Sequence, residues 1–180
     1  ALGSLVVLAI LILAGRAVSS EFHLVPLPTF IFFTASAGIA AEALKQEVFP
    51  ILIEKRPDEH PLRIWVPGCS TGEEVYSLAI ALLEFLGDRS SNLQIQIFAS
   101  DIDDKAIDKA RQGLFPANIA ADVSPERLSR FFAKEEHGYR VGKEIREMVT
   151  FATQNVVTDP PFTKLDILVC RNLLIYLTPE

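Results

Sequence analysis

One stretch of the chain decides the fold: LRIWVPGCSTGEEVYSLAIALLEFL, residues 62–86. Residues 62–66 are a short apolar run of the β type. A loop with glycines at 68 and 72 follows, and from residue 73 to 86 apolar residues recur with the periodicity of a helix. The stretch therefore predicts a strand, a glycine loop and a helix.

The same alternation continues on both sides of this stretch. An earlier helix begins near Glu42, and a charged, proline-bearing turn follows it at 55–61. Further strands are expected at 95–100, 149–153 and 165–170, and further helices at 104–113 and 125–132. The pattern indicates an α/β fold with a doubly wound, mainly parallel sheet and helices on both faces, in which ligands bind beyond the carboxyl ends of the strands.

The composition indicates one globular domain, with 49% hydrophobic and 22% charged residues in 180. A net charge of -6 gives no basic footprint and argues against a nucleic-acid partner. The two cysteines and three histidines are too scattered to form a metal site. We therefore expect no metal and a reduced, cytoplasmic setting.

The N-terminal 41 residues form an atypical apolar segment ahead of a core at 42–180. The apolar run at 5–14 is too short to cross a bilayer and lacks the basic region of a signal peptide, so we expect no membrane insertion and either a buried segment or one misread through a frameshift or gene-model error. The chain begins with Ala and stops directly after an apolar run. We therefore expect a fragment whose core is truncated at the C-terminus.

The glycine loop narrows the class of cofactor. It has neither the G-x-G-x-x-G spacing of dinucleotide-binding loops nor the Lys-Ser/Thr ending of phosphate loops, which favours a cofactor without a pyrophosphate. Ser70-x-x-Glu73 matches a capping box, so a structural role is preferred for Glu73. Glu74 is the better ligand candidate, because its carboxylate can accept from a cationic amine or from ribose hydroxyls.

Polar residues follow each predicted parallel strand. Asp101 comes directly after the second strand and could accept from both ribose hydroxyls of a nucleoside, whereas Asp103 is interpreted as a helix N-cap. Asn155 and the pair Arg171-Asn172 follow later strands. Together they predict a nucleoside site, and the cysteines at this edge are interpreted as packing residues.

Four segments in order resemble CheR-type chemotaxis-receptor methyltransferases. They are residues 63–80 (RIWVPGCSTGEEVYSLAI), 98–103 (FASDID), 151–155 (FATQN) and 170–176 (CRNLLIY). The Pro-Gly-Cys opening most resembles copies in large bacterial signalling proteins that also carry methylesterase and PAS-type domains. The resemblance implies a class I methyltransferase fold, Rossmann-like, that transfers methyl groups from S-adenosylmethionine to glutamate side chains of chemoreceptors.

The resemblance also implies roles for individual residues. Arg171 and Tyr176 would lie near the reacting methyl, and Lys134 stands where the family often has an arginine facing the substrate. The residues implied in cofactor binding are Gly68, Glu74, Asp101, Ile102, Asn155, Val156, Cys170, Arg171 and Asn172.

Two departures from the family leave alternatives open. Phe32-Phe33 is followed by Thr34 where the family usually has an arginine, and the family's terminal strand hairpin has no counterpart. We therefore expect the last strand to have one unpaired side and the fragment to be inactive. A small-molecule methyltransferase and a non-catalytic sensor or scaffold module that binds S-adenosylmethionine remain as alternatives.

Overall fold

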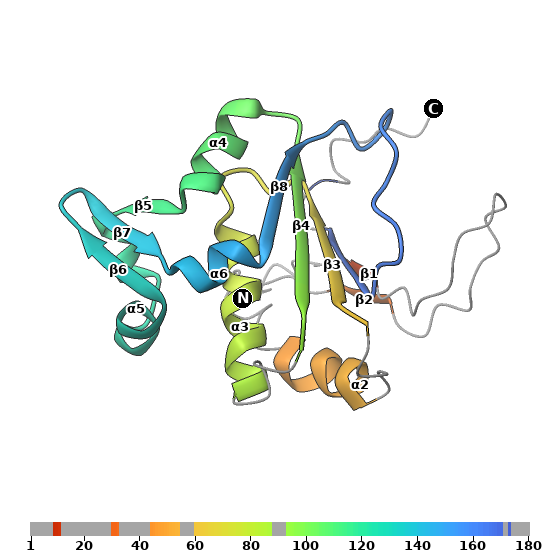
Figure 1. Cartoon of the computed structure of the whole chain (residues 1–180), viewed down its shortest axis with the longest axis horizontal. Coiled ribbons are helices and arrows are strands. Elements are labelled where there is room, and N and C mark those ends of the chain that lie inside the picture. The colour runs from red at the N-terminus through yellow and green to blue at the C-terminus, as the bar shows by residue number, and fades with distance from the viewer. Residues whose placement is uncertain are drawn as a thin grey trace, which may run out of the picture.

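The computed structural model of the chain describes residues 9–11, 30–32, 44–54, 60–87, 93–170 and 173. Its main sheet has six strands in the order β2-β1-β9-β3-β4-β8 (Figure 1). Four neighbouring strands are parallel, which confirms the predicted α/β class. In chain order the six strands are β1 (Ala9–Leu11), β2 (Phe30–Phe32), β3 (Leu62–Pro67), β4 (Ile95–Asp101), β8 (Val149–Thr153) and β9 (Ile167–Cys170).

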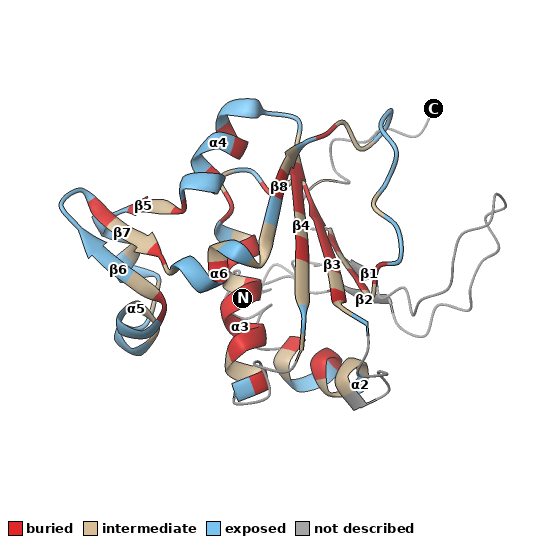
Figure 2. Cartoon of the chain, viewed as in Figure 1, coloured by how far each residue is buried: buried red, intermediate tan, exposed pale blue. Residues whose placement is uncertain are grey.

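Helices α3 (Glu73–Leu86), α4 (Asp104–Gln112) and α6 (Lys143–Glu147) cover one face of this sheet. A π-helical turn, η1 (Leu44–Val48), leads into α2 (Phe49–Glu54) and packs against α3. Figure 2 shows burial concentrated in α3 and the central strands. Ile64 and Ile97 of the sheet and Leu82 of α3 are almost fully buried, as alternation in strands and helical spacing in α3 require.

In the part of the chain that the structure describes, α3, α4 and α6 lie on one face of the sheet, and the opposite face is covered differently. Within residues 154–170 a loop covers this face, and its Phe162 ring stacks on Phe98 at 4.6 Å and meets Trp65 edge-on at 5.5 Å. Pro160 and Pro161 in this loop remove two backbone donors and disfavour a helix. Three aromatic side chains therefore cover part of this face in the described residues.

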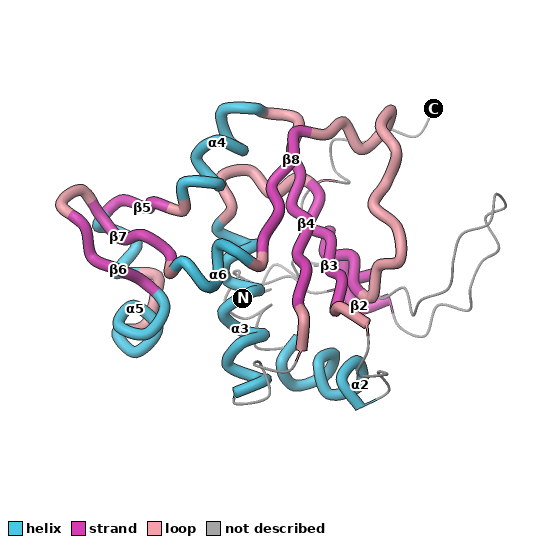
Figure 3. The backbone as a smooth tube through the Cα atoms, in the orientation of Figure 1, coloured by secondary structure: helices cyan, strands magenta, loops and turns pink. Residues whose placement is uncertain are grey.

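A small antiparallel sheet, which the sequence pattern did not predict, lies between α4 and α6 in the chain. Its strands have the order β5-β7-β6 and stand apart from the main sheet (Figure 3). Gly138 allows close pairing here, because a Cβ at this position would lie 2.0 Å from the Phe115 carbonyl oxygen. The elements of this insert are β5 (Leu114–Pro116), η3 (Ala117–Ala121), α5 (Pro125–Phe131), β6 (Phe132–Glu135) and β7 (Gly138–Val141).

The prediction of an unpaired last strand is wrong. β1 pairs antiparallel with the outer edge of β9, with Ala9 opposite Cys170 and Leu11 opposite Leu168, and β2 pairs with β1. Part of the apolar run at 5–14 thus satisfies backbone groups that β9 would otherwise expose. In the part of the chain that the structure describes, no helix is long and apolar enough to cross a membrane.

Candidate cofactor site

The glycine loop between β3 and α3 lies at the carboxyl end of the sheet. Gly68 and Gly72 both have left-handed backbone angles, with φ of 69° and 90°. A Cβ on Gly72 would also lie 3.1 Å from the Ala110 Cβ of α4. The backbone N–H of Cys69 donates to the Ser100 carbonyl at 3.0 Å, so the loop turns tightly over the end of β4.

Asp101, the last residue of β4, holds this loop in place. One carboxylate oxygen accepts from the Ser70 backbone N–H at 2.8 Å, and the other accepts from the Asp103 N–H at 3.0 Å. The carboxylate therefore connects the glycine loop to the start of α4. Each oxygen keeps acceptor capacity, since a carboxylate has about four lone-pair sites.

The N-terminus of α3 corrects the predicted capping box. Gly72 is the N-cap, with no side-chain cap, because the helix begins too late for Ser70 to reach its first turn. The Glu73 carboxylate instead accepts from the Thr71 hydroxyl at 2.7 Å. Asp103 is the N-cap of α4 as predicted, and its side chain accepts from the Lys105 N–H at 2.9 Å.

Apolar side chains stand beside the polar ones at this edge. Ile102 is 69% exposed directly after Asp101, and Val157 is 71% exposed beyond β8. Val157 was not a predicted site residue, because it lies two residues past the motif that marks Asn155. The Asn155 side chain accepts from the Val157 N–H at 3.0 Å, so it shapes the turn that presents this valine, and Val156 between them is half-buried.

Of the other predicted site residues, some lie at this edge of the sheet, some lie outside the described residues, and Lys134 lies elsewhere. Half-buried Glu74 opens α3 beside the loop, and half-buried Cys170 ends β9. A Cβ on Gly68 would come within 3.3 Å of the Leu173 side chain, so Leu173 lies against the glycine loop. Arg171, Asn172 and Tyr176 lie outside the described residues. Lys134 is not brought to this edge, because it lies exposed on β6 of the insert (Figure 1).

The chemistry of Cys69 agrees with a packing role. Cys69 is only 4% exposed, and burial together with the nearby Asp101 charge raises the pKa of its thiol to about 12. The thiol is therefore neutral near pH 7, whereas a nucleophilic cysteine needs its thiolate. Among the described residues, no group of three or more His, Cys, Asp or Glu side chains could hold a metal ion.

The chain matches the family model described as CheR methyltransferase, SAM binding domain, over residues 32–180. It is 37% identical over 139 residues to chemotaxis protein methyltransferase 2 of Vibrio cholerae, covering 75% of this chain and 48% of that protein. It is 36% identical over 140 residues to the chemotaxis protein methyltransferase of Escherichia coli, covering 71% of this chain and 46% of that protein.

A longer relative is an uncharacterized 104.1 kDa protein of Rhodobacter capsulatus, 36% identical over 154 residues, which are 86% of this chain and 16% of that protein. The chain thus spans about half the length of the methyltransferases it matches. With the family match covering most of its length, this chain belongs to the CheR methyltransferase family, in the part that binds S-adenosylmethionine.

Proposed function

We propose that this domain takes part in methyl transfer from S-adenosylmethionine to glutamate side-chain carboxylates of chemoreceptor proteins. The observation that carries the proposal is the Asp101 carboxylate, which fixes the glycine loop at the carboxyl edge of a CheR-family sheet. Relatives named as chemotaxis protein methyltransferases support the substrate class.

The described residues fit S-adenosylmethionine. The glycine loop leaves room for close approach of a ligand to the backbone, and Asp101 retains acceptor capacity for ribose hydroxyls. Exposed Ile102 and Val157 supply apolar surface for the flat adenine ring. Glu74 would accept from the cationic amine, with Asn155, Val156, Cys170, Arg171 and Asn172 completing the proposed site.

The proposed reaction needs no general base from the protein. Bound S-adenosylmethionine would supply a methyl group that its sulfonium charge already activates for transfer to a carboxylate oxygen. A glutamate side chain, with a pKa of about 4.3, is already ionised at neutral pH and needs no general base. The domain must align the carboxylate and exclude water.

Three residues are proposed to act on the substrate. Arg171 would steer the carboxylate and Tyr176 would donate a hydrogen bond to it near the reacting methyl. Lys134 lies on β6 of the insert, so its proposed contact is with a protein substrate that extends over the insert. We further propose a cytoplasmic setting, with fused methylesterase and PAS-type domains, since the matched region is 16% of the 104.1 kDa relative.

The test is transfer of radiolabelled methyl groups to a chemoreceptor cytoplasmic fragment by a full-length protein that carries this domain, because the chain alone spans about half the length of the methyltransferases it matches and is expected to be inactive. We expect label that alkali releases as methanol, as a carboxyl ester requires, and none on a fragment whose candidate glutamates are replaced by alanine. S-adenosylhomocysteine binding measured by calorimetry separates the alternatives. Binding without transfer to any acceptor would support the sensor module, and transfer to metabolites alone would support a small-molecule enzyme. Either result would overturn the proposal.

A further inference from the structure

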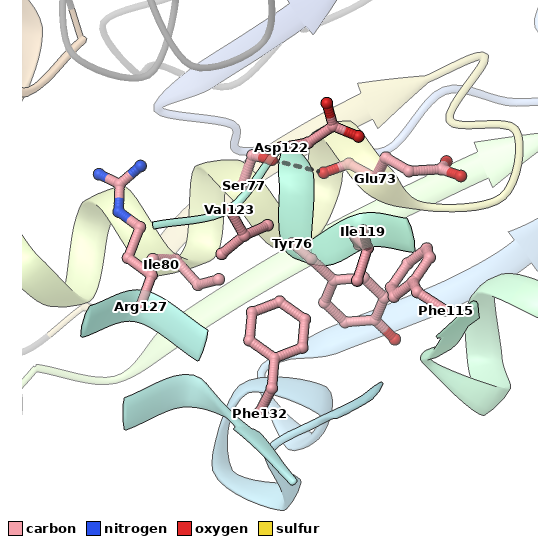
Figure 4. Close-up of a pocket in the computed structure, with 10 residues that line it drawn as sticks. All are labelled: Glu73, Tyr76, Ser77, Ile80, Phe115, Ile119, Asp122, Val123, Arg127 and Phe132. Carbon is pink, nitrogen blue, oxygen red and sulfur yellow. Dashed lines mark hydrogen bonds between the residues drawn. The ribbon is translucent and has the colours of Figure 1, made fainter. Parts of the chain in front are cut away.

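The turn that follows β8, residues 155–160, lies at the cofactor edge of the sheet, yet apolar packing does not hold it. β8 itself is fixed on the α3 side, because its Phe151 ring lies 5.7 Å from the Tyr76 ring, which in turn meets Phe115 edge-on at 5.9 Å (Figure 4). Beyond the strand, every residue from 157 to 160 is exposed. The conformation of this turn therefore depends on its hydrogen bonds.

The hydrogen bonds inside the turn all involve Asn155. Its N–H donates to the Asp159 carboxylate at 2.8 Å, and its side chain accepts from the Val157 N–H at 3.0 Å, both in exposed positions. Its carbonyl accepts from the Thr158 N–H at 3.2 Å and from the Asp159 N–H at 2.9 Å. Water competes for exposed hydrogen bonds, so a turn held by them alone opens at little cost in free energy.

Gln154 supplies a further hydrogen bond from inside the fold. This residue is only 8% exposed, and its side-chain nitrogen donates to the Pro160 carbonyl at 2.8 Å. Pro161 follows Pro160, so the backbone at 159 and 160 is biased toward extended conformations and the exit of the turn is stiff. The Gln154 N–H also donates to the Asp101 carbonyl at 2.9 Å. One residue therefore fixes both ends of the turn.

The orientation of the Gln154 amide is unfavourable for stability. Because the amide nitrogen faces the Pro160 carbonyl, the amide oxygen is left buried, and none of the described residues donates to it. A buried acceptor without a donor costs more free energy than one hydrogen bond between neutral groups returns. A leucine of similar size would avoid this cost. The amide therefore restricts the turn without stabilising the fold.

We propose that Gln154 is a positioning residue for the cofactor, whose amide holds the turn in the conformation that presents Val157 to the adenine ring. The assignment rests on the proposed function, which places adenine against Val157 and the ribose at Asp101. Gln154 acts through the turn and does not contact the cofactor. Its loss should weaken recognition of the base and leave recognition of the ribose unchanged.

The first experiment separates the base from the ribose in a full-length protein that carries this domain. Calorimetry measures S-adenosylhomocysteine, and NMR titration measures S-ribosylhomocysteine, which lacks the base. Gln154→Leu should weaken S-adenosylhomocysteine at least about tenfold, because the turn must then be ordered on binding, and leave S-ribosylhomocysteine within about twofold. The urea midpoint should not fall, since the orphaned acceptor is removed together with the hydrogen bond.

Gln96→Leu is the matched control for both ligands. Gln96 lies near the start of β4, at the opposite end of the strand from Asp101, and its side chain accepts from Arg63 at 2.9 Å. The substitution removes the same kind of side chain and one hydrogen bond, and we expect it to leave both affinities unchanged.

The second experiment tests whether Gln154 acts through the turn. In the unliganded protein, Gln154→Leu should speed amide hydrogen exchange at Val157, Thr158 and Asp159 at least about tenfold, because their hydrogen bonds to Asn155 open more often. Exchange within β8 should stay at the wild-type rate. Saturation with S-adenosylhomocysteine should slow exchange in the turn again.

Unchanged S-adenosylhomocysteine affinity in Gln154→Leu would overturn the assignment. Equal weakening of both ligands, or faster exchange throughout β8, would also overturn it, because Gln154 would then support the sheet as a whole. If Gln154→Leu fails to fold, as judged by circular dichroism, Gln154→Met takes its place with the same expectations. A wild-type protein that binds neither ligand would refute the proposed function as well, whereas cofactor binding that ignores Gln154 refutes only its positioning role.

Discussion

Asp101 combines two tasks in one carboxylate. It accepts one backbone N–H from the glycine loop and one from the residue that caps α4, so it sets the distance between these two segments. The same carboxylate is proposed to accept from the cofactor's ribose. A residue that both shapes a site and contacts its ligand should be intolerant of change, because either loss alone weakens binding.

Asp101→Ala should therefore lower the affinity for S-adenosylhomocysteine by at least about tenfold, since two charge-assisted hydrogen bonds to the loop and α4 are lost along with the ligand contact. Isothermal calorimetry measures the change. Asp108→Ala on α4 is the matched control, because Asp108 is exposed and pairs with Arg111 in a surface ion pair. Equal affinity of the Asp101 and Asp108 variants would remove Asp101 from the site.

Sequence reasoning predicted the position of Asp101 because an acid directly after an apolar strand of a parallel sheet lies at the edge where ligands bind. The predicted capping box of Ser70 and Glu73 is wrong, because the Glu73 carboxylate accepts from the Thr71 hydroxyl and Ser70 does not cap the helix. The pattern depends on which residue begins the helix, and the loop delays that start to Glu73. The left-handed backbone of Ser70, with a φ of 48°, is set by the fold around it and leaves no mark in the sequence.

Helix α3 joins three parts of the molecule through Glu84. Its carboxylate accepts from Lys45 of η1 at 2.9 Å and from Arg127 of α5 at 2.7 Å. The hydrogen bond from Arg127, followed by that from Lys45, lowers the pKa of Glu84 to about 2 although burial opposes the shift. One side chain thus links the N-terminal helical segment, the main domain and the insert.

The ion pairs of Glu84 should make the free energy of unfolding depend on pH between about 4.5 and 2. Because the folded-state pKa is lowered, the ionised Glu84 stabilises the fold above the unfolded pKa of about 4.3, and this contribution is lost as pH falls toward 2. Glu84→Gln should cost on the order of 2–3 kcal/mol at pH 7 and flatten the pH dependence between pH 4.5 and 2.

Urea denaturation across this pH range measures the effect of Glu84→Gln. Glu147→Gln is its control, because Glu147 and Lys143 form an exposed pair at 3.4 Å that should contribute little. A Glu84 variant that keeps the wild-type pH dependence would show that the ion pairs are not a stabilising link.

The parallel strands of the main sheet, the helices α3 and α4 and the insert helix α5 were predicted from the sequence, whereas β1, β2 and the small sheet of the insert were not. The helix at 73–86 and the strand at 149–153 match the structure residue for residue, because their apolar spacing is long and regular. β6 and β7 have four residues each and include Lys134, Glu135 and Arg140, so they are too short and too polar for a regular alternation to mark them. Their strand state comes from pairing with each other and with β5, which is tertiary information.

At the scale of the whole molecule, the N-terminal segment extends the sheet that carries the site. β9 pairs with β3 on one side and β1 on the other, and it ends at Cys170, next to the proposed cofactor residues. The prediction of an exposed edge was wrong because β1, which lies before the region that matches the family model, supplies the missing partner. The outer edge of β9 is therefore paired by residues about 160 earlier in the chain.

Ile10→Pro tests this dependence. Ile10 is the middle residue of β1 and lies between Val169 of β9 and Ile31 of β2, so proline removes a backbone donor inside the sheet. We expect a loss of about 2–3 kcal/mol in unfolding free energy, and faster amide hydrogen exchange at 167–170 if the β9 contact is broken. Ile10→Val keeps the N–H and is the matched control.

Because β9 leads into Arg171 and Asn172, the proline variant should also bind S-adenosylhomocysteine more weakly. Unchanged stability and exchange in the proline variant would mean that β1 does not support β9 in solution, and that the parallel strands alone hold the site.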